Sequence, residues 1–389
     1  MDAAVVTPGL IDAHSVVGLT GYLNQRQDQE QLDRSEAIQP ELRALDAYDP
    51  QERLVEWLRG FGITTLHTGH APGEIISGQT MIVKTAGRTV DEAVMVPTAM
   101  VAATLGDWTV HGDGKAPGTR SKAVAMLRGQ LIKAQAYVKK QDSATSQPAT
   151  VSDVDGPAES TPTSVTDVAG AATTQPEPPP TSSPADEGAK VENSKKPKEP
   201  PERDLRMETL ARVLRGEIPM LVTVHRAADI ITTLRLAREF NIRVVLDGAC
   251  EAYLVKSEIK AAGVPVILHP TMMRSGKGLT ENASMETASI LKIEGIRFAL
   301  QSGMESYVPK TRVVLFEAGI AAANGLLFED ALAAITIDAA RILGVDNRIG
   351  SLETGKDADI ALYDGDPFEY TSHCVGVIIN GKVVSETAQ

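Results

Sequence analysis

The sequence is poor in aromatic residues and in cysteine, and it lacks a long uninterrupted apolar run. Only 4% of its 389 residues are Phe, Trp or Tyr although 42% are hydrophobic, so we expect a core of Ala, Val, Ile and Leu. The two cysteines, Cys250 and Cys374, exclude a disulfide framework and a cysteine-based zinc site. No run reaches the roughly 18 apolar residues that a transmembrane helix needs, so we expect no membrane span.

Basic residues are outnumbered by acidic ones, which limits the partners that this chain can bind. The sequence has 38 Lys and Arg against 51 Asp and Glu, a net charge of -13. Nucleic-acid binding needs a basic surface, so we expect no nucleic-acid partner. The first residues contain no basic stretch followed by an apolar one. No signal peptide is therefore visible, and a cytoplasmic location is the default expectation.

Residues 141–203 differ in composition from everything around them. They are dominated by Pro, Ser, Thr, Ala, Asp and Glu, and they contain no aromatic residue, no Leu and no Ile. Such a stretch cannot bury enough apolar surface to offset the entropy lost on ordering. We expect a disordered insertion, which acts either as a solvated loop extension or as a binding segment for a partner.

Short apolar strands alternate with helices on both sides of this insertion. In the first block the expected strands are 62–66, 81–84 and 93–96, and the expected helices are 51–60 and 121–140. In the second block the expected strands are 219–224, 243–246, 265–268 and 297–300, and the expected helices are 208–215, 228–240, 252–262 and 288–294. Wholly apolar strands between helices indicate a parallel sheet covered on both faces, and no glycine-rich phosphate-binding motif follows any of them. The fold class is therefore α/β. We favour a (β/α)8 TIM-like barrel over an open sheet, with its first part in residues 1–140 and its second in residues 204–345.

The C-terminal residues 346–389 change character again. They follow an Ala/Ile-rich helix expected at 329–343, and residues 350–363 read as a turn and then a strand. Residues 375–384 predict a β-hairpin with Asn380-Gly381 as its two-residue turn. The sequence thus predicts a small antiparallel β module after the barrel.

Taken together, several segments resemble the amidohydrolase superfamily, in particular its imidazolonepropionase-related branch. TPGLIDAH at residues 7–14 resembles the first barrel strand of that superfamily, and GSLETGKDAD at 350–359 with ING at 379–381 resembles its C-terminal end. ISGQTMIVKT at 76–85 and VHRAADI at 224–230 are similar to the imidazolonepropionase branch, and 331–344 resembles the helix that links barrel and β module. The resemblance implies a (β/α)8 barrel, a flanking β-sandwich, and hydrolysis of non-peptide C–N bonds in a cyclic or acyl amide by metal-activated water.

The metal ligands that this resemblance implies are mostly replaced. The His-x-His of the first strand is His14-Ser15-Val16 here, so a valine stands at the second ligand position. The histidine of the fifth strand aligns with Thr223, although His225 lies two residues on and faces the same side. The histidine of the sixth strand is replaced by Asp247, and the aspartate of the eighth strand aligns with Gly303. The neighbouring Ser302 and Gln301 are not general bases at neutral pH.

Two readings of these replacements remain open. The chain is either a pseudoenzyme with an intact barrel, which binds small molecules or acts as a scaffold, or a hydrolase with a rearranged one-metal site. The rearranged site would use His14, His225 and Asp247, because three protein ligands and a water make a catalytic zinc shell. The cofactor expectation is accordingly none, or one weakly bound zinc or manganese ion. No catalytic residue can be assigned from the sequence.

Other polar residues are candidates for a retained substrate pocket. His67 and His70 follow the second strand, where they either line the barrel rim or bond to loop backbone. Lys84 is a substrate-carboxylate contact, a carbamylated metal bridge or a salt-bridged lysine. Arg226 either holds an anionic substrate or pairs with Asp229. His269 ends the seventh strand as a rim or core histidine.

The β-sandwich of the superfamily uses strands on both sides of the barrel, and only about six residues precede the Thr7-Pro8-Gly9 motif here. The N-terminus therefore looks truncated, which leaves the location of the protein unknown, and we expect an incomplete sandwich with an unpaired edge. A misplaced start, a segment of a longer chain or a partner that completes the sheet would each explain this. Expected partners are a small-molecule ligand, a second copy of the chain or an active relative.

Overall fold

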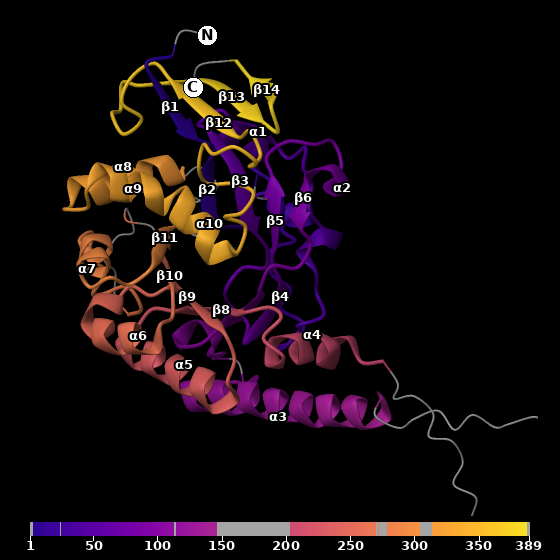
Figure 1. The fold of residues 1–389 in the computed structure, drawn as a ribbon. Coiled ribbons are helices and arrows are strands. Elements are labelled where there is room, and N and C mark those ends of the chain that lie inside the picture. The colour runs from indigo at the N-terminus through magenta and orange to yellow at the C-terminus, as the bar shows by residue number, and fades with distance from the viewer. Residues whose placement is uncertain are drawn as a thin grey trace, which may run out of the picture. The chain divides into compact units, whose positions relative to one another are not determined.

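The computed structural model describes residues 3–23, 25–112, 114–145, 203–269, 271, 278–303 and 313–386 (Figure 1). The chain divides into two units, Met1–Val138 with Arg203–Gln389, and Lys139–Glu202. Helix α3 (Arg120–Thr145) continues past residue 141, where the insertion is expected to begin. Residues 146–202 of the predicted insertion lie outside the described residues. The larger unit carries all the strands described below.

Seven strands run parallel to their neighbours, as their apolar and wholly buried sequences predict. One sheet contains β2 (Leu10–Ser15) beside β3 (Ile63–Thr68). The other contains, in order, β7 (Val101–Thr104), β8 (Met220–Val224), β9 (Val244–Gly248), β10 (Val266–Leu268) and β11 (Phe298–Leu300). Strands predicted at 62–66, 219–224, 243–246, 265–268 and 297–300 are thereby confirmed within a few residues.

Three further strands pair antiparallel with their neighbours, and two of them connect the two sheets. β4 (Ile76–Gln79) pairs antiparallel with β7, and β5 (Met81–Lys84) pairs antiparallel with β3 and with β6 (Val94–Val96). Only Thr80 separates β4 from β5, so one extended segment crosses from one sheet to the other. Because this segment opposes both β3 and β7, the carboxyl ends of β2, β3 and β7 to β11 lie at the same end of the molecule.

The described strands thus form mixed sheets rather than the uniformly parallel barrel that the sequence predicts. β11 and β2 contact each other, but no ladder of hydrogen bonds joins these two strands in the described part of the chain. The α/β class is confirmed, while closure of the barrel remains a prediction.

Helices flank the strands, and six of the eight named next lie at predicted places. They are α1 (Arg53–Arg59), α2 (Val90–Ala93), α3, α4 (Leu205–Leu214), α5 (Ala227–Phe240), α6 (Lys256–Ala262), α7 (Thr287–Ile293) and α8 (Val314–Ala323). Figure 1 shows α5, α6 and α7 on the side of β8 to β10 that faces away from β2 and β3. The helix α5 buries Ile230 and Leu234 one turn apart, and it ends where Asn241 adopts a left-handed conformation, φ 52°.

The single helix predicted at 329–343 is instead two helices, α9 (Phe328–Ala334) and α10 (Ile337–Leu343). The break lies at Thr336, whose φ of -136° and ψ of -101° are not helical. β-Branched residues adjoin this point, Ile335 and Thr336, and their restricted side chains weaken helix formation. The Thr336 hydroxyl donates to the Leu332 carbonyl oxygen at 2.6 Å, which caps the end of α9.

The C-terminal module is a four-stranded sheet in the order β1 (Val5–Pro8), β12 (Ile360–Tyr363), β13 (Cys374–Ile379) and β14 (Lys382–Ser385). The predicted hairpin is confirmed, because Asn380 and Gly381 both have positive φ, 51° and 74°. The expectation that no N-terminal strand joins this sheet is wrong: β1 pairs antiparallel with β12 from Val5 to Pro8. The short apolar run before Gly9 was sufficient to form it.

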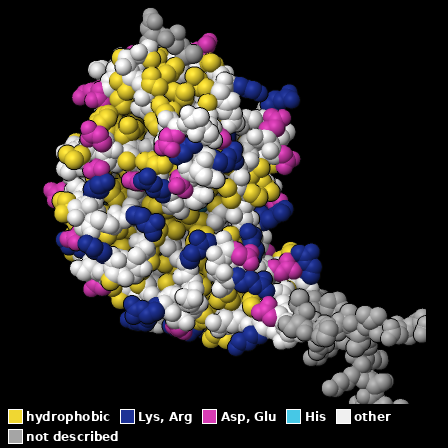
Figure 2. Space-filling view, in the orientation of Figure 1, with side chains coloured by type: hydrophobic (Ala, Val, Ile, Leu, Met, Phe, Trp, Pro, Cys, Tyr) yellow, Lys and Arg dark blue, Asp and Glu magenta, His cyan; other side chains and the backbone are white. Residues whose placement is uncertain are grey.

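Two apolar clusters fill the larger unit. The smaller cluster contains side chains from one face of strands in both sheets, and these side chains pack against α10. Its strand members are Ile11, Ala13, Ile82, Leu221, Val245, Ile267 and Ala299. None of the described helices combines the length and apolarity needed to cross a membrane. The face seen in Figure 2 carries interspersed acidic and basic side chains, with no extended field of one sign.

Candidate functional site

A layer of buried polar side chains lies directly beyond the smaller apolar cluster. Side chains two residues apart on a strand face the same side. Leu221, Val245, Ile267 and Ala299 are therefore followed on the same face by polar residues at the carboxyl ends of β8 to β11. These polar residues are Thr223, Asp247, His269 and Gln301, and all are buried. Carboxyl ends of parallel strands are where active sites of α/β folds lie.

Asp247 is the centre of this layer, and both of its carboxylate oxygens are hydrogen-bonded. Oδ1 lies 2.9 Å from Nδ1 of His14 and accepts from Nε2 of Gln301 at 2.9 Å. Oδ2 accepts from the Thr223 hydroxyl at 2.5 Å. These donors come from three other strands or strand ends, so a side chain that is only 2% exposed ties both sheets together.

Asp247 and His14 form a buried ion pair. Burial alone would raise the pKa of Asp247, but the charge of His14 and the three hydrogen bonds hold that pKa below its ordinary value. Burial opposes the charged form of His14 as well, yet the adjacent Asp247 carboxylate raises the pKa of His14 above its ordinary value. Two of the three candidate metal ligands, His14 and Asp247, therefore neutralise each other directly.

Asp12 forms a second buried carboxylate site that the sequence analysis overlooked. Its Oδ1 accepts from the backbone N–H of Ser302 at 3.1 Å and of His14 at 3.3 Å, and its Oδ2 accepts from the Ser302 hydroxyl. Burial raises the pKa of Asp12 to about 6, against the lowering effect of these hydrogen bonds. The signal in the sequence was its position two residues before His14, on the same side of β2.

His67 lies beside this network but does not open onto a rim. Its Nδ1 lies 2.7 Å from the Ala13 carbonyl oxygen and its Nε2 lies 2.6 Å from the Thr80 hydroxyl. A carbonyl only accepts, so Nδ1 carries the proton and Nε2 accepts from Thr80. Burial lowers the pKa of His67 to about 3, so the ring is neutral. Its two nitrogens are both used to join β2, β3 and the crossing segment.

His225 contacts Cys250 and Trp108. Its Nδ1 lies 3.0 Å from Sγ of Cys250, and its ring meets the Trp108 ring edge-on at a centroid distance of 4.8 Å. Burial lowers the pKa of His225 to about 4, although Asp247 and Glu251 act in the opposite direction. The predicted set of His14, His225 and Asp247 is therefore brought into one region but not into one coordination shell.

The donor set does not fit a catalytic metal. Across the described residues, no group of three or more His, Cys, Asp and Glu side chains is placed to hold a metal ion. Both Asp247 oxygens are used by hydrogen-bond donors, and so are both His67 nitrogens. In this region Nε2 of His14 and Nε2 of His225 are buried and have no hydrogen-bond partner. The ring nitrogens and carboxylates of the described residues thus do not form a group of three ligands around one point.

The interpretation of Lys84 as a substrate or metal-bridging residue is wrong. β5 runs antiparallel to β3, with Thr65 opposite Lys84, so Lys84 lies at the end of the molecule opposite His14 and Asp247. Its ammonium group is buried and forms ion pairs with Asp359 and, at 3.1 Å, with Asp357. The salt-bridge alternative is confirmed, and the pair links the barrel strands to the C-terminal module.

Arg226 forms an ion pair, but with a different partner from the one expected. Its Nη2 lies 3.0 Å from Asp107, while Asp229 pairs with Arg120 at 3.3 Å. The strand-to-helix segment after β7 supplies both Asp107 and Arg120, and it was not assigned a role from the sequence.

The remaining predicted positions are buried. His70 and His269 are 5% and 1% exposed, so neither forms an open rim. Val16 is 4% exposed, and Gly303 has a φ of 79°. Gln301 lies beside Asp247, and its Nε2 donates to Oδ1 of Asp247 at 2.9 Å.

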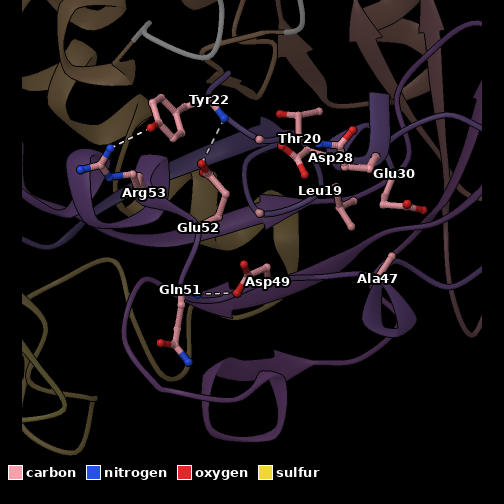
Figure 3. Close-up of a pocket in the computed structure, with 13 residues that line it drawn as sticks. Leu19, Thr20, Tyr22, Asp28, Glu30, Ala47, Asp49, Gln51, Glu52 and Arg53 are labelled. Carbon is pink, nitrogen blue, oxygen red and sulfur yellow. Dashed lines mark hydrogen bonds between the residues drawn. The ribbon is translucent and has the colours of Figure 1, made fainter. Parts of the chain in front are cut away.

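A hollow of about 350 Å³ lies in the segment between β2 and α1 (Figure 3). Four carboxylates line it, Asp28, Glu30, Asp49 and Glu52. Glu52 accepts from the backbone N–H of Tyr22 at 3.2 Å and of Leu54 at 2.8 Å, so part of its capacity is used in capping α1. This hollow shares no lining residue with the Asp247 network.

Comparisons with known proteins agree on one family. The Amidohydrolase family matches residues 310–385. The amidohydrolase tasK of Hapsidospora irregularis is 23% identical over 396 residues, which cover 97% of this chain and 36% of that protein. Imidazolonepropionase of Shewanella frigidimarina is 40% identical over 63 residues, 15% of each chain. The chain thus spans about a third or less of these relatives in its matches.

Solved structures show the same fold. An amidohydrolase from Thermotoga maritima MSB8 matches with a TM-score of 0.82 and 26% identity, covering 98% of this chain and 87% of that one. A 5-methylcytosine deaminase from Klebsiella pneumoniae matches with a TM-score of 0.50 and 13% identity, covering 98% and 87%, a likeness of fold alone.

Proposed function

We propose that this chain, which belongs to the amidohydrolase superfamily, binds a small polar molecule at the carboxyl ends of its strands without metal-dependent hydrolysis. In the superfamily chemistry, a bound metal lowers the pKa of water and polarises the substrate carbonyl of a non-peptide C–N bond. We infer that the Asp247–His14 ion pair stands in this chain where such a centre would be. The protein would then be a binding or scaffold subunit, either alone, as a homo-oligomer or paired with an active relative.

The observation that carries this proposal is the hydrogen bonding of Asp247. A carboxylate that already accepts from His14, Gln301 and Thr223 gains little from a cation, because a metal would have to displace charge-assisted hydrogen bonds inside the protein. Gln301 is an amide, so it orients Asp247 but cannot take a proton from water. Both carboxylate oxygens of Asp247 are thus already occupied by hydrogen-bond donors of the protein.

The chemistry left to this layer is recognition. His14 and His225 each keep one ring nitrogen, Nε2, without a hydrogen-bond partner. The charged ring of His14 would donate, whereas the neutral ring of His225 can donate or accept according to its tautomer. Such a pair would orient a carbonyl or amide group of a ligand.

A second candidate function is favoured by the same two atoms. If His14 and His225 both turned their Nε2 atoms toward one ion, Asp247 could act as a third, rearranged ligand, and hydrolysis of a cyclic or acyl amide would be retained. In this case a zinc or manganese ion would supply an activated water.

Metal content distinguishes the two candidates. The full chain, purified without a histidine tag and dialysed against trace zinc and manganese, would be analysed by inductively coupled plasma mass spectrometry. We expect less than about 0.1 metal per chain, because the described residues gather no group of three metal-ligating side chains.

The variants His14→Ala and Asp247→Ala are the informative comparison, and His373→Ala is the matched control because His373 is an exposed histidine paired with Asp364 in the C-terminal module. About one metal per chain that is lost in the first two variants and kept in the control would overturn the proposal. That result would establish the rearranged hydrolase site and justify a screen of cyclic amides.

A further inference from the structure

A second hollow, of about 390 Å³, lies at the same end of the molecule as the Asp247 network but shares no residue with it. Three chain segments form it, and each follows the carboxyl end of a strand, β2, β3 or β7. Its lining residues are Arg34, Ser35, Ala37, Glu74, His111, Lys115 and Ala116. Loops at this end of an α/β fold are where ligands are bound. The acidic and basic side chains of this lining indicate which kind of ligand would fit.

Glu74 is the buried acid of this hollow. Its side chain is 2% exposed, and its Oε1 has no hydrogen-bond partner among the described residues. Its Oε2 lies 3.5 Å from Nε2 of His111, a long contact to a ring that is itself one quarter exposed. A buried carboxylate oxygen without a donor is costly, so a ligand that brings an N–H group would recover free energy.

Arg34 and Lys115 supply exposed positive charge around this acid. Burial raises the pKa of Glu74, while His111 and Arg34 act to lower it and Asp33 acts to raise it. The lining of this hollow thus contains two basic side chains and one buried acidic side chain, in a chain whose net charge is -13. A ligand that fits must therefore carry a negative group as well as a donor.

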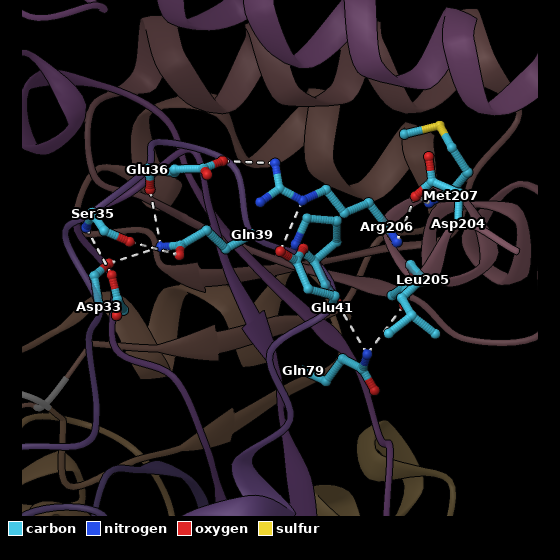
Figure 4. Close-up of polar contacts among 12 residues, drawn as sticks. Asp33, Ser35, Glu36, Gln39, Glu41, Gln79, Asp204, Leu205, Arg206 and Met207 are labelled. Carbon is cyan, nitrogen blue, oxygen red and sulfur yellow. Dashed lines mark hydrogen bonds and ion pairs between the residues drawn. The ribbon is translucent and has the colours of Figure 1, made fainter. Parts of the chain in front are cut away.

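The walls of the hollow are held in place before any ligand arrives. Figure 4 shows Ser35 donating its backbone N–H to Asp33 at 2.7 Å and its hydroxyl to Gln39 at 3.2 Å. Gln39 in turn donates to the carbonyl oxygens of Asp33 and Glu36, each at 3.0 Å. Arg206 of α4 donates hydrogen bonds to Glu36 and Glu41, which links α4 to this segment.

The other two segments are also fixed. Beside Glu74, the N–H of Gly73 donates to the Thr104 hydroxyl of β7 at 3.0 Å. In the segment that carries His111, the backbone N–H of His111 donates to the Pro117 carbonyl oxygen at 2.9 Å, which forms a closed loop. Ordered walls reduce the entropy that binding costs.

We propose that this hollow is a binding site for a small zwitterion, whose ammonium or N–H group meets Glu74 and whose carboxylate meets Arg34 and Lys115. An amino acid has this chemistry, with its two charged groups on one short frame. Because the hollow shares no residue with the Asp247 network, the proposal does not depend on whether that network holds metal.

Ligand-observed saturation-transfer NMR on the full chain tests the chemistry with matched probes. The zwitterions are L-alanine and 4-aminobutanoate, with a short and a long spacing between charges. The controls are butanoate and butylamine, which each carry one of the two charges. We expect at least one zwitterion to bind saturably and both controls to bind about tenfold more weakly or worse, since each loses one charge-assisted contact.

Variants then locate the site. Arg34→Gln and Glu74→Gln should each raise the dissociation constant of the bound zwitterion by about tenfold or more. Arg43→Gln is the matched control, because Arg43 is an exposed arginine of the same segment that pairs with Asp46 instead. Arg34 is exposed, so its variant remains informative if Glu74→Gln fails to fold.

Three results would overturn the proposal. The first is no saturable binding of either zwitterion up to about 50 mM, below which a specific contact of this kind should be detectable. The second is binding that Arg34→Gln leaves unchanged. The third is binding that is lost in Asp247→Asn but kept in Arg34→Gln, which would assign the ligand to the strand ends instead.

Discussion

Replacing Asp247 by Asn tests the buried ion pair with almost no change in shape. The Asn side-chain oxygen can still accept from His14 and Gln301, and its amide can donate to the Thr223 hydroxyl by reversing that hydrogen bond. What is lost is the negative charge. His14 would then be buried without a counter-ion and would give up its proton. This deprotonation limits the loss in the free energy of unfolding.

The expected loss is about 2–4 kcal/mol of unfolding free energy near pH 6, since removing one partner of a buried pair costs about 3–5 kcal/mol when the other stays charged. The pKa of His14 is raised in the folded state, so its contribution is complete below its ordinary value of 6.5 and is lost as the pH rises through the folded pKa. The pKa of Asp247 is lowered, so its contribution is present above 3.8 and is lost in acid. The effect of the variant should therefore be largest between about pH 4 and 6.5 and smaller at pH 9.

Urea unfolding followed by circular dichroism at pH 6 and pH 9 measures this difference. Asp46→Asn serves as the control, because it removes an exposed pair with Arg43 that is worth at most about 1 kcal/mol. A loss below about 1 kcal/mol for Asp247→Asn, or an equal loss at both pH values, would show that the two side chains are not a buried ion pair.

Three other variants follow from the same physical arguments. Burial raises the pKa of Asp12 from 3.8 to about 6, so the free energy of unfolding should fall by roughly 3 kcal/mol as the pH rises across that range. In urea titrations, Asp12→Asn should make the free energy of unfolding less dependent on pH between pH 4 and 6. Burial lowers the pKa of His67 to about 3 and of His225 to about 4. The free energy of unfolding should therefore fall below pH 6.5 by about 1.4 kcal/mol per pH unit for each histidine, and His225→Gln should reduce this dependence on pH. A slope unchanged in His225→Gln would contradict a neutral buried ring. Lys84→Met should lower the unfolding free energy by about 3–5 kcal/mol by leaving Asp359 buried and unpaired, and Lys84→Met combined with Asp359→Leu should recover part of it.

The regular parts of the fold were predictable because local pattern and tertiary environment agree there. The strands β8 and β9 and the helix α5 were each located within two residues from apolar periodicity. α8 was missed because its sequence, VLFEAGIAAA, is apolar on nearly every side and gives no helical periodicity. β7 was missed because VAAT is short and rich in alanine, a weak strand former.

The candidate site was predictable in composition but not in its contacts. His14 and Asp247 could be named from the strand ends, yet nothing in a linear sequence shows that they bond to each other rather than to a shared ion. The role of Lys84 depends on the antiparallel direction of β5, which a uniformly parallel barrel does not predict. Asp12 was overlooked because it belongs to the motif that identified the strand, and its raised pKa depends on burial that only the fold creates.

The state of the His14 ring tests the central claim most directly. The sequence contains seven histidines, so selective 15N-histidine labelling gives a small set of ring signals, and His14→Gln identifies the one required. The account predicts that Nδ1 of His14 is protonated in its hydrogen bond to Asp247, and that one equivalent of zinc leaves the signals of His14 and His225 unchanged. Signals of both rings that shift together with one equivalent of zinc, and return when the metal is chelated, would contradict it and establish a metal centre.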